Sequence, residues 1–163
     1  MKASFPPVVD AGVRILVLGS LPGEMSLAAA QYYANPRNQF WRLMQAVTGR
    51  PLLGAAYAER LAQLLSAHVG LWDAIAIAER RGSLDGAIRN AAANTLADLV
   101  ASLPTLRAVA FNGAKAAAIG RKELGQPDGL ALIDLPSSSP AHARVSFEGK
   151  LAAWMALKPY LAS

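Results

Sequence analysis

Apolar residues fall along the chain in two kinds of segment. Four short runs of mostly aliphatic residues are typical of strands covered on both faces, and they lie at residues 14–18, 70–77, 106–113 and 130–135. Other segments space their apolar residues as an amphipathic helix does, and they lie at residues 38–47, 55–68, 94–103, 114–120 and 146–162. We expect Asn38 to cap a helix that begins at Gln39, Asn94 to cap the segment that it opens, and Pro104 to end that segment.

Strands that alternate with helices predict an α/β fold, with a parallel or mostly parallel sheet between helices on both faces. In such folds ligands bind beyond the carboxyl ends of the strands, beside the loops that follow. We therefore expect functional residues in the segments that follow or end the apolar runs. These are GSLPGEMS with YYANPRNQFW, then LWDAI, FNGAKA and LPSSSPAHA.

The composition excludes several kinds of site. The 163 residues suffice for one domain that folds without a disulfide or a structural metal, and we expect a single domain over residues 1–163. Because the chain has no cysteine, disulfides, thiolate zinc sites and iron–sulfur clusters are excluded, which fits a reducing cytosol. No apolar run approaches the roughly 20 residues of a membrane helix, and the first residues lack the apolar core of a signal peptide. We expect a soluble, cytoplasmic protein that binds no membrane.

Lysine and arginine outnumber aspartate and glutamate by 16 to 11, which gives a formal net charge of +5. This excess suits a polyanionic partner such as a nucleic acid, and it is equally compatible with a solvated surface that binds none. Charge alone leaves both interpretations open.

The loop after the first apolar run combines two glycines with a proline. Gly19 and Gly23 let the backbone approach a ligand, Pro22 restricts the turn, and the N–H groups around Ser20 are available to a base or a phosphate. An ordinary strand-to-helix turn uses the same residue types. The G-x-G-x-x-G spacing of a dinucleotide site is absent.

Four aromatic rings lie within the ten residues of YYANPRNQFW. Core packing of the following helix accounts for Phe40 and Trp41. Tyr33 lies beside a Pro-Arg-Asn loop, where its ring offers a flat face to a base and Arg37 offers a charge to a phosphate.

Two later loops carry amide and hydroxyl groups. Asn112 follows a buried strand and can point into the crevice, although Asn-Gly is also an ordinary turn. Ser137, Ser138 and Ser139 lie between prolines, and such serine clusters are good phosphate contacts. His142 nearby is a surface histidine unless this loop meets a ligand.

In this order, the quoted segments resemble the uracil-DNA glycosylase superfamily, from about Phe5 to the final helix. The resemblance is strongest to hypoxanthine (deoxyinosine) DNA glycosylases, which share GS-x-PG, YYA-x-PRN-x-FW and SSSPA. Mismatch-specific uracil-DNA glycosylases, which share A-x-P-x-N-x-FW, come next. The resemblance implies a three-layer α/β/α sandwich around a short, mainly parallel sheet. It also implies an enzyme that swings a deaminated base out of double-stranded DNA and hydrolyses the N-glycosidic bond without a metal, a cofactor or a covalent intermediate.

The resemblance further implies roles for single residues. Asn38 stands where the hypoxanthine DNA glycosylases have the asparagine that holds the attacking water, whereas mismatch-specific relatives use an asparagine at the position of Leu21. Tyr33 falls where relatives stack a ring on the extruded base, and Asp73 falls where they hydrogen-bond to its edge.

The last loop normally contacts phosphate and fills the gap in the duplex. Because Ala141 is small, Pro140 or His142 is the candidate wedge. The complete predicted set comprises catalytic Asn38 and Ser20, base-binding Gly19, Tyr33, Phe40, Asp73 and Asn112, and DNA-binding Arg37, Ser137, Ser138, Ser139, Pro140, Ala141 and His142.

The chemistry of the base edge limits what these residues can select. An asparagine amide places water but is a poor proton acceptor, so the reaction needs a largely dissociative transition state in which DNA phosphates stabilise the sugar cation. Hypoxanthine presents N1–H beside O6, and uracil presents N3–H beside O4, so a carboxylate acceptor and a backbone donor suit both. Guanine has the same pair and must be rejected at its 2-amino group. The preference for hypoxanthine therefore rests on the resemblance.

Other functions remain open at this point. A G:U mismatch-specific uracil-DNA glycosylase and a non-catalytic nucleic-acid binder, with Leu21 marking the lost activity, fit the same fold. A serine hydrolase would use Ser20 or the cluster at 137–139 with His142 and Asp134, although the G-x-S-x-G elbow is missing. We expect a monomer, because a base-flipping enzyme engages one lesion at a time.

Overall fold

Four parallel strands form the centre of the fold in the computed structural model, which describes residues 5–20, 24–74 and 96–162. Their order across the sheet is β2-β1-β3-β4, and all three neighbouring pairs are parallel. Helices lie on both sides, so the predicted α/β class is confirmed. The strands are β1 (Ile15–Gly19), β2 (Val69–Asp73), β3 (Ala108–Asn112) and β4 (Ala131–Leu135).

The register of the sheet brings three strand ends into one row. Gly19 at the end of β1 pairs with Asp73 at the end of β2. On the other side of β1, Leu18 pairs with Phe111, so the next residue of β3, Asn112, stands beside Gly19. Parallel pairing thus places Asp73, Gly19 and Asn112 at the same edge of the sheet.

Alternate residues of each strand face different layers. In β1, Ile15 and Val17 pack into a core with the helices α2, α3 and α7, whereas Leu16 and Leu18 pack into a second core with α6. All four side chains are fully buried. A strand covered on both faces needs an uninterrupted apolar run, which is the pattern that identified β1 in the sequence.

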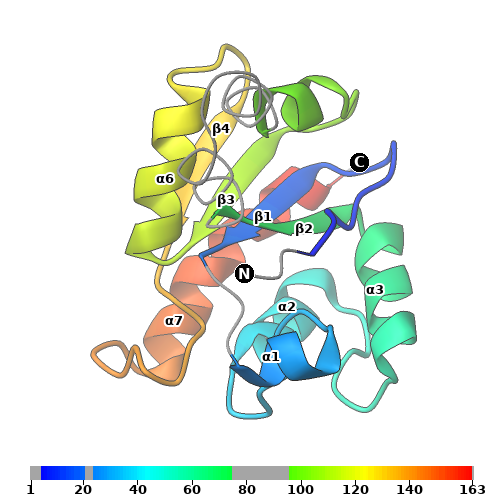
Figure 1. Cartoon of the computed structure of the whole chain (residues 1–163), viewed down its shortest axis with the longest axis vertical. Helices are drawn as coiled ribbons and strands as arrows, with labels where there is room; N and C mark the ends of the chain where they lie inside the picture. Colours follow the sequence, from blue (N-terminus) through cyan, green and yellow to red (C-terminus); the bar gives the residue numbers. More distant parts are fainter. Residues whose placement is uncertain (1–4, 21–23, 75–95, 163) are drawn as a thin grey trace.

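The helices surround this sheet, and Figure 1 shows α6 and α7 toward one side of the view and α1, α2 and α3 toward the other. The strand β4 leads into the segment 136–146, which joins it to α7. The helix bounds are α1 (Glu24–Ala29), α2 (Phe40–Thr48), α3 (Tyr57–Ser66), α6 (Ala114–Leu124), α7 (Phe147–Trp154) and the 3-10 helix η1 (Met155–Leu161); residues 96–101 are also helical.

Several predicted boundaries differ from those observed. The helix α6 extends to Leu124, four residues beyond the predicted end. The segment predicted as one closing helix is an α-helix only to Trp154 and continues as a 3-10 helix that contains Pro159, which lacks the N–H that a longer α-helix would need. The strand β2 begins one residue earlier than predicted; the predicted strand residues 75–77 and Asn94 lie outside the described residues.

The start of α2 also corrects the predicted cap. The helix begins at Phe40, with Gln39 at the N-cap position, so Asn38 stands one residue further out than expected. Its Oδ1 nevertheless accepts a hydrogen bond from the Phe40 N–H at 2.9 Å, which satisfies one of the free N–H groups of the first turn. Among the described helices, none is long and apolar enough to cross a membrane.

Candidate active site

A cavity of about 520 Å³ opens at the carboxyl ends of β1, β2 and β3, a size usual for small-molecule sites. Its lining residues come from β1 and the loop that follows it, α1, the segment between α1 and α2, β2, β3 and the segment after β4. From the predicted set it brings together Gly19, Ser20, Tyr33, Asn38, Asp73, Asn112, Ser137, Ser138, Ser139, Pro140 and Ala141; it is also lined by Met25, Ser26, Tyr32 and Asn35. Tyr33 and Asn38, which the resemblance assigns to base stacking and water, thus face one shared cavity.

The floor of the cavity requires a glycine at position 19. A Cβ added there would lie 2.7 Å from the hydroxyl oxygen of Tyr33 and 2.8 Å from Oδ1 of Asp73. Both oxygens therefore converge on space that any side chain at this position would fill. The glycine serves the close approach of these two groups rather than an unusual backbone angle.

Tyr33 is held in an uncommon backbone conformation. Its φ is +56°, in the left-handed region that bulky residues seldom adopt. Hydrogen bonds fix this turn, because Trp41 Nε1 donates to the Tyr33 carbonyl at 3.1 Å and the Ala34 N–H donates to Ser26 Oγ at 3.0 Å. The ring stacks on Phe40 with centroids 4.0 Å apart and an interplanar angle of 14°. One face of the ring is thus occupied by Phe40, and a base would have to use the other.

A hydrogen-bonded chain joins β3, the serine loop and the segment before α2. Asn112 Oδ1 accepts from the Ser138 N–H at 2.8 Å, and Asn112 Nδ2 donates to Ser138 Oγ at 2.9 Å. Ser138 Oγ donates in turn to Asn38 Oδ1 at 2.8 Å. Asn112 and Ser138 are 6% and 1% exposed, so these bonds lie in a water-poor environment where they are strong.

The segment that carries Asn38 and the loop that carries Ser138 are also joined directly. The Gln39 N–H donates to the Ser138 carbonyl at 2.9 Å. Lys150 on α7 is 2% exposed, and its ammonium donates to Gln39 Oε1 at 3.0 Å and to the Ser139 carbonyl at 3.2 Å. Burial lowers the pKa of this lysine. Lys150 on α7 therefore binds both segments and holds them together.

Asp73 is the carboxylic acid of the cavity lining. Its side chain is 3% exposed, and Oδ2 has no hydrogen-bond partner among the described residues. Burial raises the pKa of this carboxyl from 3.8 to about 7. Burial, followed by the charge of Asp73, also raises the pKa of Tyr33, whereas the hydrogen bond from Asn112 lowers it. The cavity thus holds a carboxyl that titrates near neutral pH and a phenol that stays protonated.

Three predicted site residues do not line the cavity. Phe40 is fully buried behind the Tyr33 ring, so the predicted contact between Phe40 and a base is replaced by support of Tyr33. Arg37 is exposed, and His142 is partly exposed in the loop just past Ala141. Both lie outside the cavity lining, where they can face only a larger partner. Leu21 lies outside the described residues.

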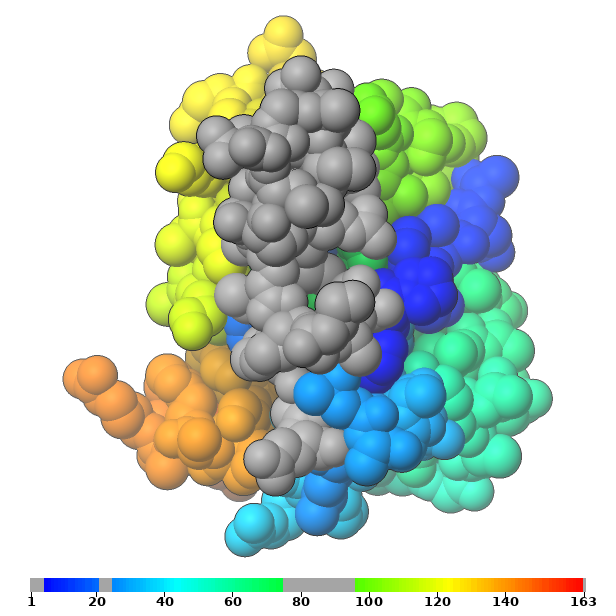
Figure 2. Space-filling view, viewed as in Figure 1, coloured from blue at the N-terminus to red at the C-terminus, as the bar shows by residue number. Residues whose placement is uncertain are grey.

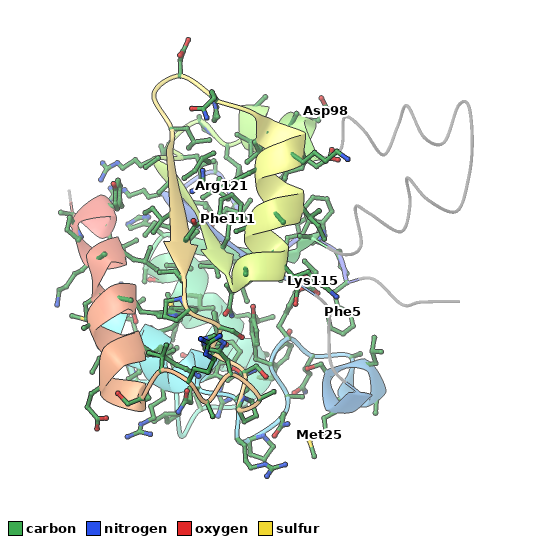
Figure 3. All side chains as sticks on the ribbon, turned by 90° about the vertical axis from the view of Figure 1, so that its left-hand side faces the viewer. Phe5, Met25, Asp98, Phe111, Lys115 and Arg121 are labelled. Carbon is green, nitrogen blue, oxygen red and sulfur yellow. The ribbon has the colours of Figure 1, made fainter. Side chains whose placement is uncertain are left out.

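Four residues of the cavity lining were missed by the sequence analysis although they belong to the quoted segments: Met25, Ser26, Tyr32 and Asn35. The first two lie on α1. Ser26 is 5% exposed and holds Ala34, as described above, while its carbonyl accepts from the Gln31 N–H at 3.0 Å. Met25 lines the cavity and is 53% exposed, and Figure 3 shows its side chain pointing away from the sheet. No sequence pattern marks either residue, because their roles depend on how α1 folds back over Tyr33.

The predicted residues of a serine hydrolase are not assembled. Asp134 is exposed and pairs with Arg121 of α6 at 3.1 Å. The hydroxyl of Ser138 is engaged with Asn38, and His142 lies outside the cavity lining. The described residues also contain no group of three or more histidine, cysteine, aspartate or glutamate side chains placed to hold a metal ion.

Comparisons with known proteins agree on one family. Residues 6–158 match the family model of the uracil DNA glycosylase superfamily. A protein of Methanosarcina acetivorans named hypoxanthine DNA glycosylase is 41% identical over 147 residues, which cover 90% of this chain and 91% of that protein. A protein of the same name from Methanosarcina barkeri is 41% identical over 70% of this chain and 72% of its own length. The solution NMR structure of a candidate uracil DNA glycosylase from Methanosarcina acetivorans has a TM-score of 0.76 and 36% identity, and covers 98% of both chains.

Proposed function

Because the chain belongs to the uracil DNA glycosylase superfamily, we propose that it is a monofunctional DNA glycosylase of base excision repair, with hypoxanthine as its preferred base. It flips a deaminated base out of double-stranded DNA and hydrolyses the N-glycosidic bond. The names of its two Methanosarcina relatives support hypoxanthine. The observation that carries the proposal is the cavity that Asp73, Tyr33 and Asn38 share.

Asp73 is the group that holds the edge of the base. A buried carboxylate oxygen without a partner is costly, and a ligand N–H would supply the missing hydrogen bond. N1–H of hypoxanthine is such a donor, whereas N1 of adenine is an acceptor and would face the carboxylate unfavourably. This difference lets the pocket reject the normal base from which hypoxanthine arises.

Tyr33 provides the platform on which the flipped base stacks. Its ring is supported from behind by Phe40, and the turn that carries it is fixed by Trp41 and Ser26. A rigid ring needs little ordering when the base arrives, so more of the stacking energy remains to offset the few kcal/mol lost when the base leaves the helix.

Hydrolysis proceeds through a largely dissociative transition state. Asn38 places the water, the N–H groups around Ser20 support the charge that develops on the departing base, and the phosphates stabilise the sugar cation. The residues of this scheme need no metal or cofactor.

The DNA contacts lie around the rim of the cavity. The segment 136–146 projects from the lower left of the molecule in Figure 2, and it contains the serine cluster together with Pro140, Ala141 and His142. Ser137 and Ser139 contact phosphate, Pro140 or His142 fills the gap left by the flipped base, and Arg37 on the neighbouring loop adds a phosphate contact. Binding to phosphates weakens steeply as the salt concentration rises.

A single domain that acts as a cytoplasmic monomer completes the proposal. The single family match over residues 6–158 supports one domain over these residues, and the absence of cysteine suits a reducing compartment. Gel filtration with and without duplex DNA tests whether the protein is a monomer.

The decisive experiment incubates the protein with matched duplexes that carry inosine, uracil, xanthine or only normal bases, followed by alkali. We expect alkali-dependent strand cleavage at inosine and no cleavage without alkali, because a monofunctional enzyme leaves an intact abasic site. Cleavage only at uracil opposite guanine would favour the mismatch-specific alternative. Tight binding without base release from any duplex would identify a non-catalytic DNA-binding protein.

A further inference from the structure

We propose that Asn38 meets the substrate as a hydrogen-bond donor, and that Ser138 is the positioning residue that imposes this orientation. The inference rests on the proposed function for its meaning in catalysis. It rests on the hydrogen-bonded chain described above for its geometry. Both ends of that chain are fixed by backbone N–H groups, which can only donate.

The first fixed group is the Ser138 N–H. A backbone N–H cannot accept, so the atom of Asn112 that lies 2.8 Å from it must be the amide oxygen. The amino group of Asn112 therefore lies on the other side, 2.9 Å from Ser138 Oγ and 3.3 Å from the Tyr33 hydroxyl. Its two hydrogens are directed to these two oxygens.

The orientation of the Ser138 hydroxyl follows. Ser138 Oγ already accepts from Asn112, so its single hydrogen is free to point along the 2.8 Å contact to Asn38 Oδ1. The side chain is 1% exposed, which keeps water from competing for this hydrogen. The orientation of the Asn112 amide therefore determines where the Ser138 hydroxyl hydrogen points, and this hydrogen in turn orients the Asn38 amide.

The second fixed donor is the Phe40 N–H, which lies 2.9 Å from Asn38 Oδ1. With the Ser138 hydroxyl it occupies both lone pairs of that oxygen. Turning the Asn38 amide over would place its amino group against the Phe40 N–H, so donor would face donor. The amino group of Asn38 is therefore the part of this amide that remains for the cavity.

This orientation limits what Asn38 can do. It cannot take up a hydrogen from the attacking water, since its oxygen is saturated. It donates instead, either to the water oxygen or to an acceptor atom of the departing base. Asp73 Oδ2, which has no partner among the described residues, is an acceptor in the cavity wall. The Tyr33 hydroxyl, which accepts from Asn112, likewise keeps its own hydrogen for donation.

The sharpest test replaces Asn38 by aspartate, which keeps the shape and changes a donor to an acceptor. At pH 8, with inosine duplex in single turnover, we expect Asn38→Asp to release base within about tenfold of the rate of Asn38→Ala, both at least about 100-fold below the original protein. An acceptor role would leave Asn38→Asp close to the original rate, which would overturn the proposal.

Ser138→Ala tests the positioning role, with Ser102→Ala as the matched control. Ser102 is an exposed serine whose hydroxyl binds the Leu99 carbonyl, so its loss leaves the chain of bonds intact. We expect Ser138→Ala to slow base release about tenfold at unchanged affinity for the duplex. Ser138→Cys should release base at a rate between those of Ser138→Ala and the original protein, and Ser102→Ala should match the original protein. Equal rates for Ser138→Ala and Ser102→Ala would contradict the role.

A measurement that does not depend on activity separates this inference from the proposed function. The side-chain amide signals of Asn38 in NMR spectra are assigned by their loss in Asn38→Asp. We expect Ser138→Ala to shift and broaden them, and Ser102→Ala to leave them in place. If the original protein releases no base from any duplex, the proposed function fails, and these signals still decide whether Ser138 positions the Asn38 amide. Unchanged Asn38 signals in Ser138→Ala would refute the positioning role of Ser138.

Discussion

Polar side chains are buried at the carboxyl ends of the strands, whereas the layer between the sheet and α6 is built from apolar ones. The latter core contains Phe111, which Figure 3 shows between the sheet and α6, and it is typical of a layer that only stabilises the fold. The five buried polar residues of the described chain all line the cavity or hold its loops: Ser26, Asp73, Asn112, Ser138 and Lys150. Because each buried polar group costs stability unless it is satisfied, their gathering at one edge marks that edge as the functional one.

The largest effect is expected at Asn38, where the polar edge meets the substrate. Asn38→Ala should reduce base release at least about 100-fold, since removal of one well-placed polar group from a preorganised site has this effect. Affinity for an inosine duplex should change little, because phosphate contacts dominate it. Single-turnover cleavage and fluorescence anisotropy measure the two quantities. An equal loss of both would assign Asn38 to DNA binding rather than to hydrolysis.

A pair of glycine substitutions contrasts the two regions directly. At Gly19 a new Cβ would meet Tyr33 and Asp73, and at Gly120 it would overlap the Phe111 ring. Gly19→Ala should therefore abolish most base release by filling the cavity floor. Gly120→Ala should destabilise the fold by about 1–3 kcal/mol and leave the rate of each folded molecule unchanged.

Thermal melts and rates corrected for the folded fraction distinguish the two variants. For a chain of this size, each kcal/mol lowers Tm by roughly 2–4 °C. If Gly19→Ala lost only stability while Gly120→Ala lost activity, the assignment of function to the polar edge would be wrong.

The pH dependence of Asp73 separates stability from activity at a single residue. Its pKa is raised from 3.8 to about 7 in the folded protein, so the folded state binds a proton that the unfolded state has released. This contribution to stability is complete below about pH 4 and is lost as the pH rises through about 7, by at most about 4 kcal/mol. Base release should change in the opposite direction, because the ionised carboxylate accepts N1–H of the base.

Asp73→Asn is the variant that tests this opposition. Urea midpoints at pH 5 and pH 8 should fall with pH in the original protein and fall less in the variant, which cannot titrate. The rise in base release through about pH 7 should also disappear in Asp73→Asn. A variant that keeps this rise would place the titrating group elsewhere.

The sequence predicted much of this contrast because parallel pairing aligns strand ends. Once β1 and β3 are recognised as neighbouring parallel strands, Gly19 and Asn112 meet at one edge. Asp73 lay inside the predicted run 70–77, and the resemblance assigned it to the site. The core on the α6 side was equally predictable, because its strand residues belong to uninterrupted apolar runs and residues 114–120 show the apolar spacing of a helix.

The rest of the site depended on contacts that no local pattern contains. Ser138 was predicted as a phosphate contact, yet it is 1% exposed and bonded to Asn112 and Asn38, which lie 26 and 100 residues away in the chain. Phe40 was predicted both as a core residue of its helix and as a base contact; it is a core residue that supports Tyr33 and does not line the cavity. Lys150 was not singled out, because a lysine in an amphipathic segment is normally solvated and its burial arises only when α7 packs beneath two loops.

The smallest effect is expected at Lys150, which belongs to the polar edge but lies one step from the cavity. Lys150→Met keeps an unbranched side chain of similar length and removes the donors to Gln39 and to the Ser139 carbonyl. The variant loses two hydrogen bonds and also the cost of a buried charge, so its unfolding free energy should change by no more than about 1 kcal/mol. Base release should fall severalfold because the loops that carry Asn38 and Ser138 are no longer fastened together. The exposed Lys158 gives the control Lys158→Met, which should match the original protein in both assays. A Lys150→Met variant with full activity would limit the functional region to the residues that line the cavity.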